Sequence, residues 1–340
     1  MKKPLVSIIV LNWNGKKWLA KCLPTLVKIK YKPLEIIVVN NGSTDDSAHF
    51  LKTKFPEIKV IEIKKNAGYA RANNIGVKKA LGKYVLLMNN DTTATPSFVT
   101  PLVDAMEMDS SIGIIQPQIR SMIYPNLLDS VGSFFTFTGF LYHFGYMKPH
   151  TLNKYNKDLF AYSIKGACFI MRRDDYIKLG GFDEDFVCYV EESDLCHRVW
   201  LSGKKVMYLP KSTIYHWGGG DMQVMTRSEL TVFRSFRNRY LSYLKNLSIP
   251  TLILLLPVHF LYCELFVLAA LFSGQLKRSI SAQLGILAPL IMLNKTLRKR
   301  KKIQENIRTV TDWSIFKYGF RNPRLSYYYY LFSDIRRYKD

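Results

Sequence analysis

Short, continuous apolar runs rich in Val and Ile recur through the first third of this 340-residue chain and limit the folds open to it. Segments of helical period, such as 16–27 and 70–81, separate the runs. Strands that are apolar on both sides are buried on both faces, so such runs connected by helices predict a parallel α/β sheet of the nucleotide-binding kind. The predicted strands are residues 6–11, 34–39, 60–63, 84–88 and 112–116.

Polar residues follow four of these predicted strands at the point where each strand ends. In open parallel sheets, ligands bind beyond the carboxyl ends of the strands. Side-chain amides and hydroxyls can hydrogen-bond a base and a ribose, and Asp91 could hold a divalent cation that bridges a diphosphate. One such loop alone would predict only a turn, because Asn, Gly, Ser and Asp are ordinary turn residues. The four loops are residues 12–15, 40–45, 66–71 and 89–92.

A cluster of carboxylates lies in the segment 180–220, although the chain carries a formal net charge of +23. The run 193–201 has helical spacing that Gly203 would end, so the last acids of the cluster fall at the first turn of a helix, where any protein favours them. The apolar run 186–190 would bring them into a partly buried place, which predicts a site for a cation, a proton, or both. The cluster comprises Asp183, Glu184, Asp185, Glu191, Glu192 and Asp194, six of 26 acidic residues.

Seven segments, in order along the chain, resemble the motifs of family 2 glycosyltransferases of the GT-A fold, and within them the rhamnosyltransferase-like group. The resemblance implies an inverting enzyme that uses nucleotide sugars, built on a mostly parallel sheet flanked by helices. It covers about residues 6–219. The segments are VSIIVLNWNG, IIVVNNGSTDDS, NAGYARANNIG, YVLLMNNDT, KGACFIMRRDDYIKLGGFDEDF, YVEESDLCHR and IYHWGG.

The resemblance implies roles on the donor side. Asp91 aligns with the last acid of the family's D-x-D-like motif and would bind Mg²⁺ or Mn²⁺ together with His216 of the Y-H-x-G-G segment. His216 follows a predicted strand 205–209 and a predicted loop 210–215, and a lone His is more often a satisfied polar residue than a metal ligand. The predicted donor-binding residues are Asn12, Asn14 and Asn41 around the base and ribose, Asn90 beside the metal, and Arg71 at the diphosphate.

The resemblance also implies a catalytic base and an acceptor side. Glu192 aligns with the family's catalytic Asp and would take a proton from an acceptor hydroxyl during a single in-line displacement, with Glu191 and Asp194 as acidic neighbours. Small residues let a backbone approach a sugar closely. The predicted acceptor side is Gly166, Ala167, Gly180, Gly181 and Phe182.

Three positions depart from the family's pattern. Asn40 stands where the family has an Asp, which leaves the nucleotide open among UDP, dTDP and GDP. Residues 89–91 carry one carboxylate, so His216 and the donor's own phosphates would supply much of the metal coordination. Glu192 is one methylene longer than the family's Asp, which would reshape the acceptor pocket.

The chain changes character after residue 227, so we expect a catalytic domain over 1–227 and a helical membrane-associated region over 228–340. Residues 249–272 could span a bilayer, but they include two prolines, His259 and Glu264. A single span would carry the basic run 295–302 away from the catalytic side, against the positive-inside tendency. We therefore favour helices in the membrane plane over a span; a soluble hairpin or dimer interface stays open, as does the role of the tyrosines at 327–330.

Composition bears on the compartment and the partners. Five cysteines without a C-x-x-C pair indicate no disulfide framework and fit a reduced, cytosolic setting, and the first 15 residues lack a signal-peptide pattern. We expect an enzyme at the cytoplasmic face of the cell membrane that moves a sugar to a lipid-linked or cell-surface glycan acceptor. The resemblance to the rhamnosyltransferase-like group alone implies that the sugar is rhamnose.

Other functions stay open at this stage. A processive polysaccharide synthase is disfavoured because the chain has no Q-x-x-R-W motif and no array of spans. A nucleotidyltransferase would need a better glycine-rich loop near the N-terminus. A degenerate, noncatalytic scaffold is the non-enzymatic alternative. No recognised nucleic-acid motif is present, so we expect no nucleic-acid partner, and the oligomeric state is open.

Overall fold

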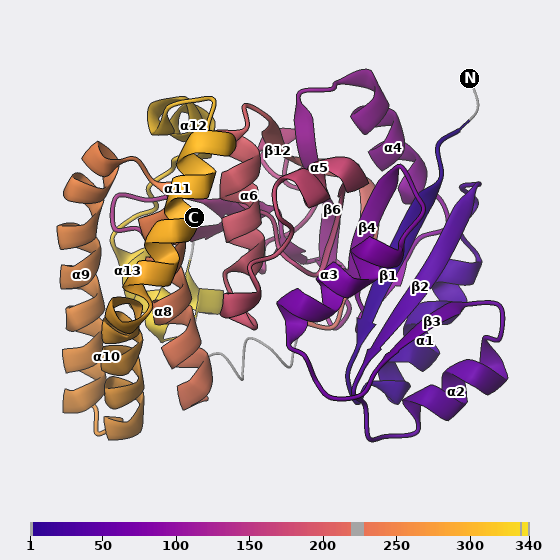
Figure 1. The fold of residues 1–340 in the computed structure, drawn as a ribbon, viewed down its shortest axis with the longest axis horizontal. Coiled ribbons are helices and arrows are strands. Elements are labelled where there is room, and N and C mark those ends of the chain that lie inside the picture. Colours follow the sequence, from indigo (N-terminus) through magenta and orange to yellow (C-terminus); the bar gives the residue numbers. More distant parts are fainter. Residues whose placement is uncertain (1–2, 219–227, 334, 339–340) are drawn as a thin grey trace.

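A mixed sheet forms the centre of the computed structural model, which describes residues 3–218, 228–333 and 335–338. Among these residues, ten strands form one sheet whose main order is β10-β12-β6-β11-β4-β1-β2-β3 (Figure 1), with β5 paired to β12 and β7 to β6. β8 and β9 form a separate sheet of two strands. The strands are β1 Val6–Asn12, β2 Leu34–Asn41, β3 Lys59–Ile63, β4 Tyr84–Asn89, β5 Thr92–Ala94, β6 Ile112–Ser121, β7 Leu128–Ser130, β8 Gly132–Phe134, β9 Tyr142–Phe144, β10 Leu159–Phe160, β11 Cys168–Arg172 and β12 Lys205–His216.

The parallel half of the sheet confirms the expected α/β fold. β1 pairs in parallel with both β2 and β4, and β2 pairs in parallel with β3. β11 is an exception, because it runs antiparallel between β4 and β6. A short apolar run carries no information about strand direction, which depends on the connection before it. The carboxyl ends of β1, β2 and β4 therefore meet at one edge, as predicted.

Helices cover both faces of the sheet. One buried cluster joins β1 and β4 to α1, α2 and α4, and a second joins the opposite face to α3, α5 and α6. The predicted helix 16–27 is confirmed, and the predicted helix 70–81 begins one residue earlier and ends at Lys79, because Ala80 is extended. The helices are α1 Lys16–Val27, α2 Ser47–Lys54, α3 Tyr69–Lys79, α4 Val99–Met108, α5 Arg173–Lys178 and α6 Glu191–Leu201.

β12 corrects one local prediction. The expected loop 210–215 is part of a strand that continues to His216 and pairs with β6 on one side and β5 on the other. A register shift between Leu209 and Thr213 absorbs Pro210, whose missing N–H would otherwise break a ladder hydrogen bond. The continuous strand carries His216 to the functional edge of the sheet.

The C-terminal helices pack on the side of α6 that faces away from β1 and β2 (Figure 1). Tyr243 and Ile303 belong to the same buried cluster as Leu195 of α6, so this region shares a core with the sheet. The predicted boundary between residues 227 and 228 adjoins 219–227, which lie outside the described residues together with Gly219 of the IYHWGG segment. The helices are α8 Glu229–Asn246, α9 Ile249–Phe272, α10 Leu276–Ile291, α11 Leu293–Asn306, α12 Asp312–Gly319 and α13 Ser326–Phe332, with short 3₁₀ turns η1 Glu184–Phe186 and η2 Ile335–Arg337.

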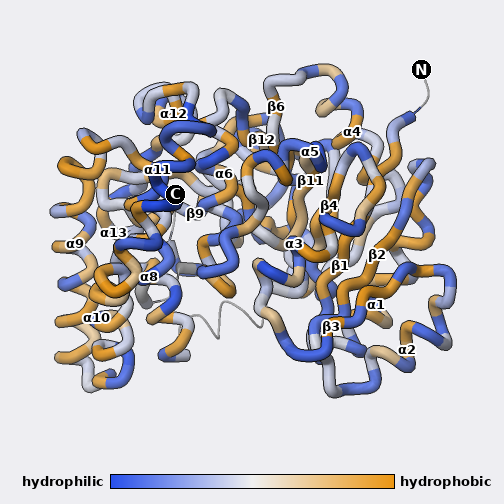
Figure 2. Tube along the Cα trace, in the orientation of Figure 1, coloured by the Kyte–Doolittle hydropathy of each residue, from blue (hydrophilic) through white to orange (hydrophobic). Residues whose placement is uncertain are grey.

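α9 and α10 present an apolar outer face. α9 is 24 residues long, and an 18-residue window within it has a mean hydropathy of 2.2. Among the described residues, it is the one single helix that is long and apolar enough to cross a bilayer. α10 and α11 together would also qualify, but they are bent by 67°. Figure 2 shows α9 as mainly hydrophobic. Leu254, Phe272 and Ile291 on these two helices are 76%, 85% and 92% exposed. Soluble monomeric proteins rarely expose many large apolar side chains on neighbouring elements.

The basic run 295–302 is divided between two environments. Lys299 is partly buried and Lys295 is exposed, and both pair with Asp185, while Lys301 and Lys302 are exposed on α11. The run therefore offers fewer free cations to an anionic surface than its sequence indicates.

Candidate active site

A cavity of about 1050 Å³ lies at the carboxyl ends of the parallel strands. Its wall combines the ends of β1, β2, β4 and β12, the segments that precede β11 and α6, and the first turns of α8. Donor, metal, catalytic and acceptor predictions meet in this one place. The predicted residues that line it are Asn41, Asn90, Asp91, Gly166, Ala167, Glu191, Glu192 and His216.

Asn12 and Asn14 support the cavity from behind. Asn12 is buried at the end of β1, and its Oδ1 accepts a hydrogen bond from Asn90 Nδ2 at 2.7 Å. Asn14 Oδ1 accepts from the backbone N–H of Thr44 at 2.7 Å. Both side chains therefore hold loops in place, and Asn41 is the one of the three asparagines predicted at the base and ribose that lines the cavity.

Arg71, Gly181 and Phe182 also lie outside the cavity wall. Arg71 is exposed on α3, where its Nε lies 3.8 Å from Glu184 Oε2. Phe182 is buried, and its carbonyl accepts from Asn74 Nδ2 at 2.9 Å. Gly181 has φ +62°, and a Cβ there would lie 2.6 Å from Asn74 Oδ1. Gly181 and Phe182, predicted on the acceptor side, thus pack behind the wall.

His216 is held between two carboxylates. Its Nδ1 lies 2.8 Å from Asp129 Oδ2 and its Nε2 lies 3.3 Å from Asp91 Oδ1. Burial opposes the charged imidazole, but Asp129 and Asp91 outweigh it and raise the pKa of His216 to about 9. Burial likewise opposes the charge of Asp129, yet Lys165 at 2.8 Å and His216 hold the pKa of that carboxyl well below its usual range.

The side chains of Asp91 and His216 are of the kinds that bind a divalent cation. Apart from its 3.3 Å contact with Asp91 Oδ1, His216 Nε2 is buried without a hydrogen-bond partner, while Nδ1 is oriented by Asp129 as in most metal-bound imidazoles. An imidazole binds a metal through an unprotonated nitrogen, so a cation would replace the proton on Nε2. No group of three or more His, Cys, Asp or Glu in the described part of the chain could hold a metal, so phosphate oxygens and water would complete the coordination.

Glu191 and Glu192 stand at the start of α6 and face the cavity. Burial raises the pKa of Glu192 to about 7, against the attraction of Lys165. Gly166 lies opposite, where a Cβ would come within 3.8 Å of the Glu192 Cβ. A carboxyl with a pKa near 7 in a cavity has the property expected of a general base.

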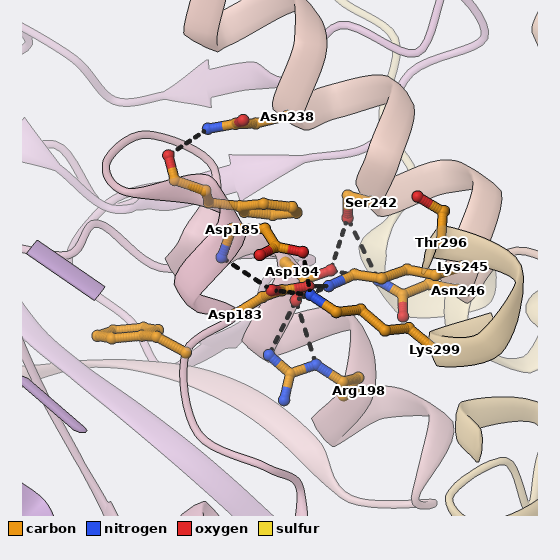
Figure 3. Close-up of polar contacts among 12 residues, drawn as sticks. Asp183, Asp185, Asp194, Arg198, Asn238, Ser242, Lys245, Asn246, Thr296 and Lys299 are labelled. Atoms are coloured by element: carbon orange, nitrogen blue, oxygen red, sulfur yellow. Dashed lines mark hydrogen bonds and ion pairs between the residues drawn. The ribbon is translucent and has the colours of Figure 1, made fainter. Parts of the chain in front are cut away.

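Asp194 does not line the cavity. It is fully buried on the far side of the α6 first turn, where its Oδ2 lies 2.8 Å from Arg198 Nη2 and 3.0 Å from Lys245 Nζ (Figure 3). Its Oδ1 accepts from Asn246 at 2.7 Å. Burial raises its pKa, but Lys245 and Arg198 reverse this and lower it. Adjacency in the sequence groups Asp194 with the catalytic acids, but residues two positions apart on a helix lie about 200° apart around its axis, so Asp194 points away from the face that carries Glu192.

Sequence reasoning missed three residues of the site. Asp129 and Lys165 form the ion pair that orients His216, and Tyr69 donates from its hydroxyl to the Gly166 carbonyl at 2.9 Å. Tyr69 and Lys165 lie inside the recognised segments NAGYAR and KGACF, which is a signal that could have found them. Asp129 lies in a segment without any motif.

Solved structures of similar architecture identify the fold. A mannosyltransferase from Pyrobaculum calidifontis, solved in complex with GDP-Man and Mn²⁺, matches with a TM-score of 0.55 and 16% identity over 89% of this chain and 86% of that chain. GalNAc-T7, solved with UDP, GalNAc and Mn²⁺, matches with a TM-score of 0.53 and 18% identity over 63% of this chain and 43% of that chain. Such identities show the fold alone, and the fold is GT-A.

The family follows from the sequence comparison. The model for glycosyl transferase family 2 matches residues 7–180, half of the chain, and one described as the N-terminal domain of galactosyltransferase matches 149–217. The chain belongs to glycosyltransferase family 2 and is a glycosyltransferase, as the motifs predicted.

Two relatives differ in how much of them the chain spans. An uncharacterized glycosyltransferase of Haemophilus influenzae is 36% identical over 112 residues, which cover 32% of this chain and only 35% of that protein. The N-acetylglucosaminyl-diphospho-decaprenol L-rhamnosyltransferase of Mycobacterium tuberculosis is 24% identical over 237 residues, which cover 62% of this chain and 76% of that protein.

Proposed function

We propose that this protein transfers a sugar from a nucleoside-diphosphate sugar to an acceptor hydroxyl with inversion, and that Glu192 is the general base. The observation that carries the proposal is the cavity itself, where Glu192, with its raised pKa, meets Asp91 and His216. These three residues come from segments far apart in the chain, and a purely structural role would not require them to share one cavity.

The proposed reaction is a single displacement. Glu192 takes the proton of the acceptor hydroxyl while the oxygen of that hydroxyl forms a bond to the anomeric carbon of the donor sugar. The bond between the anomeric carbon and the phosphate oxygen breaks, and the electron pair of this bond leaves with the nucleoside diphosphate. Asp91 and His216 would hold Mg²⁺ or Mn²⁺, which when bound neutralises charge on the diphosphate. Asn41 and Asn90 would bind the donor. Arg71 would turn to the diphosphate, which costs little because its pair with Glu184 is exposed.

The proposed acceptor is a polyprenyl-linked or surface glycan. Similarity to a rhamnosyltransferase whose name specifies N-acetylglucosaminyl-diphospho-decaprenol supports this acceptor class and supports rhamnose as the sugar. Gly166 and Ala167 would lie against the acceptor, since they line the cavity beside Glu192. A lipid-linked acceptor stays in the membrane, so the cavity must lie close to the membrane surface. The apolar surface of α9 and α10 would bind the membrane and hold the cavity there.

Replacement of Asp91 by Asn is expected to abolish the effect of Mn²⁺ on nucleotide binding. The amide keeps the size of the side chain but removes the one carboxylate in residues 89–91. Calorimetric titration of UDP, dTDP and GDP with and without Mn²⁺ should show a metal-dependent gain in the wild type and a loss of about tenfold in affinity in the variant. Asp174→Asn, at a carboxylate that is 97% exposed on α5, should keep the gain. An unchanged Mn²⁺ effect in Asp91→Asn would remove Asp91 from the metal site.

We propose that the apolar face of α9 and α10 lies in the cytoplasmic leaflet, with the helices in the membrane plane. Leu254→Glu is expected to lower the fraction bound to vesicles of phosphatidylglycerol and phosphatidylethanolamine by about tenfold, because one buried leucine contributes about 1.5–3 kcal/mol. Leu81→Glu is the matched control, since Leu81 and Leu254 are both 76% exposed but Leu81 follows α3 on the catalytic side. Equal vesicle binding of the two variants in a sedimentation assay would contradict the proposed surface.

A further inference from the structure

The segment that leads into Glu192 has a strained backbone. Val187, Tyr189 and Val190 have φ values of 62°, 73° and 72°, in the left-handed region that side chains with a Cβ rarely adopt. The strain is greatest for β-branched residues such as valine. All three line the cavity, and Val190 is followed directly by Glu191 and Glu192. Contacts from outside the segment must therefore hold this conformation.

Asn238 of α8 makes contacts of that kind. Its side chain is fully buried, and its Nδ2 donates to the carbonyls of Phe186, Cys188 and Tyr189 at 3.0, 3.0 and 2.8 Å. Figure 3 shows Asn238 reaching this loop from the helix. One amide group thus binds three carbonyls of a single turn, and those carbonyls belong to the residues around the strained positions.

Ion pairs with the C-terminal helices flank the segment 187–190, at Asp183 and Asp185 before it and at Asp194 after it. Lys245, two turns after Asn238 on α8, pairs with Asp183 at one end and with Asp194 Oδ2 at the other end, at 3.0 Å (Figure 3). Lys299 of α11 pairs with Asp183 as well and with Asp185 Oδ2 at 2.6 Å. The C-terminal helices therefore contact the chain before the segment 187–190, within it and after it.

We propose that Asn238 is a positioning residue for transfer: it holds the segment 187–190 in the conformation that presents Glu192 to the acceptor. The proposal rests on the proposed role of Glu192. It assigns to the C-terminal helices a part in catalysis besides their apolar surface. Asn238 does not line the cavity, so it acts through the loop and has no contact with substrate.

Asn238→Leu tests the proposal, because leucine has nearly the same size but cannot donate. We expect kcat to fall by about 10²-fold, as for a base that is misplaced by about 1 Å, while the Kd for the nucleoside diphosphate stays within about twofold. The fall of kcat/KM in acid (its acidic limb) should also begin at a pH below 7, because a displaced Glu192 is more exposed to solvent and burial no longer raises its pKa to about 7. The groups that face Glu192 are Lys165, Tyr69, Glu191 and Cys196, and the variant leaves them unchanged. Asn238→Ser, which keeps one hydrogen-bond donor, should lower kcat by a smaller factor. It replaces the leucine variant in the test if that variant does not fold.

The control is Thr296→Val on α11. Thr296 is buried beside the ion pairs in Figure 3, and its hydroxyl donates to the Met292 carbonyl of its own helix, so its loss should lower the melting temperature and leave kcat and the pH limb unchanged. The assay uses the full chain, with the UDP-, dTDP- or GDP-sugar that the wild type turns over and N-acetylglucosaminyl-diphospho-polyprenol as the acceptor. If both Asn238 variants change the melting temperature alone, the positioning role is wrong. If Glu192→Gln turns over like the wild type, the proposed role of Glu192 as the base fails, whatever the Asn238 variants do, so the two failures are distinguishable.

Discussion

Glu192→Gln is expected to lower kcat by about 10²–10⁴-fold while the affinity for the nucleoside diphosphate stays within about twofold. The amide has the same shape but cannot accept the acceptor's proton, and a positioned general base contributes about that factor. The measurement is steady-state transfer together with calorimetric titration of the nucleotide. Glu57→Gln, at an exposed surface position, should behave like the wild type. If Glu191→Gln loses transfer and Glu192→Gln keeps it, the base is the neighbouring residue.

The same residue should set the response to acid. Burial raises the pKa of Glu192 to about 7, and the base acts only when it is deprotonated. The value of kcat/KM should therefore rise with pH up to about 7 and fall about tenfold for each pH unit below it. Glu192→Gln should lack this limb. A limb that persists in the variant would belong to another group.

Lys245→Met is expected to lower the free energy of unfolding by about 3–5 kcal/mol at pH 7. The lysine is almost fully buried and pairs with two buried carboxylates, Asp183 and Asp194, and the variant would leave each of them with a single cation, Lys299 or Arg198. Urea unfolding, followed by tryptophan fluorescence, measures the change. Lys301→Met, on the exposed side of α11, should change the free energy by less than about 0.5 kcal/mol.

The destabilisation should depend on pH with a definite sign. Burial opposes the charge of Asp183 and Asp194, but Lys245 is the first of the cations that nevertheless lower both pKa values below those of the unfolded chain. The stabilisation is therefore complete above the ordinary aspartate pKa and is lost as the pH falls through the lower folded-state values. The gap between wild type and Lys245→Met should be largest near pH 7 and should shrink toward pH 3. A gap that is independent of pH would argue for lost packing in place of lost charge compensation.

Much of the sheet and half of the site were predictable from local patterns. Apolar runs located β1 to β4 and β6, and the rule that ligands lie beyond strand ends placed Asn41, Asn90 and Asp91 in one cavity. The motifs placed Glu192 and His216 there as well. The positions of these residues, though not their roles, could be predicted because a strand end and the first turn of a helix are defined by neighbouring residues.

The remaining features depend on contacts between distant segments. Asp194 looks catalytic beside Glu192, but its side chain pairs with Arg198 of the same helix and with Lys245, which arrives from α8. Asp129 has no motif, yet it orients His216 from 87 residues away. The left-handed backbone at Val187 contradicts the preference of valine, so no sequence pattern could predict it. Such departures from local preference are expected at functional sites, where packing from elsewhere maintains them.

The central claim is that the cavity holds a nucleoside diphosphate with a divalent cation, and a thermal-shift panel tests it most directly. The full chain, purified in detergent, would be melted with UDP, dTDP or GDP, with and without Mn²⁺. A ligand at about 100 times its Kd stabilises the native state by about 2.7 kcal/mol, so one nucleotide should raise the melting temperature by a few degrees, and only with the metal. No shift with any nucleotide, from a sample that melts cooperatively, would contradict the claim and favour a noncatalytic scaffold.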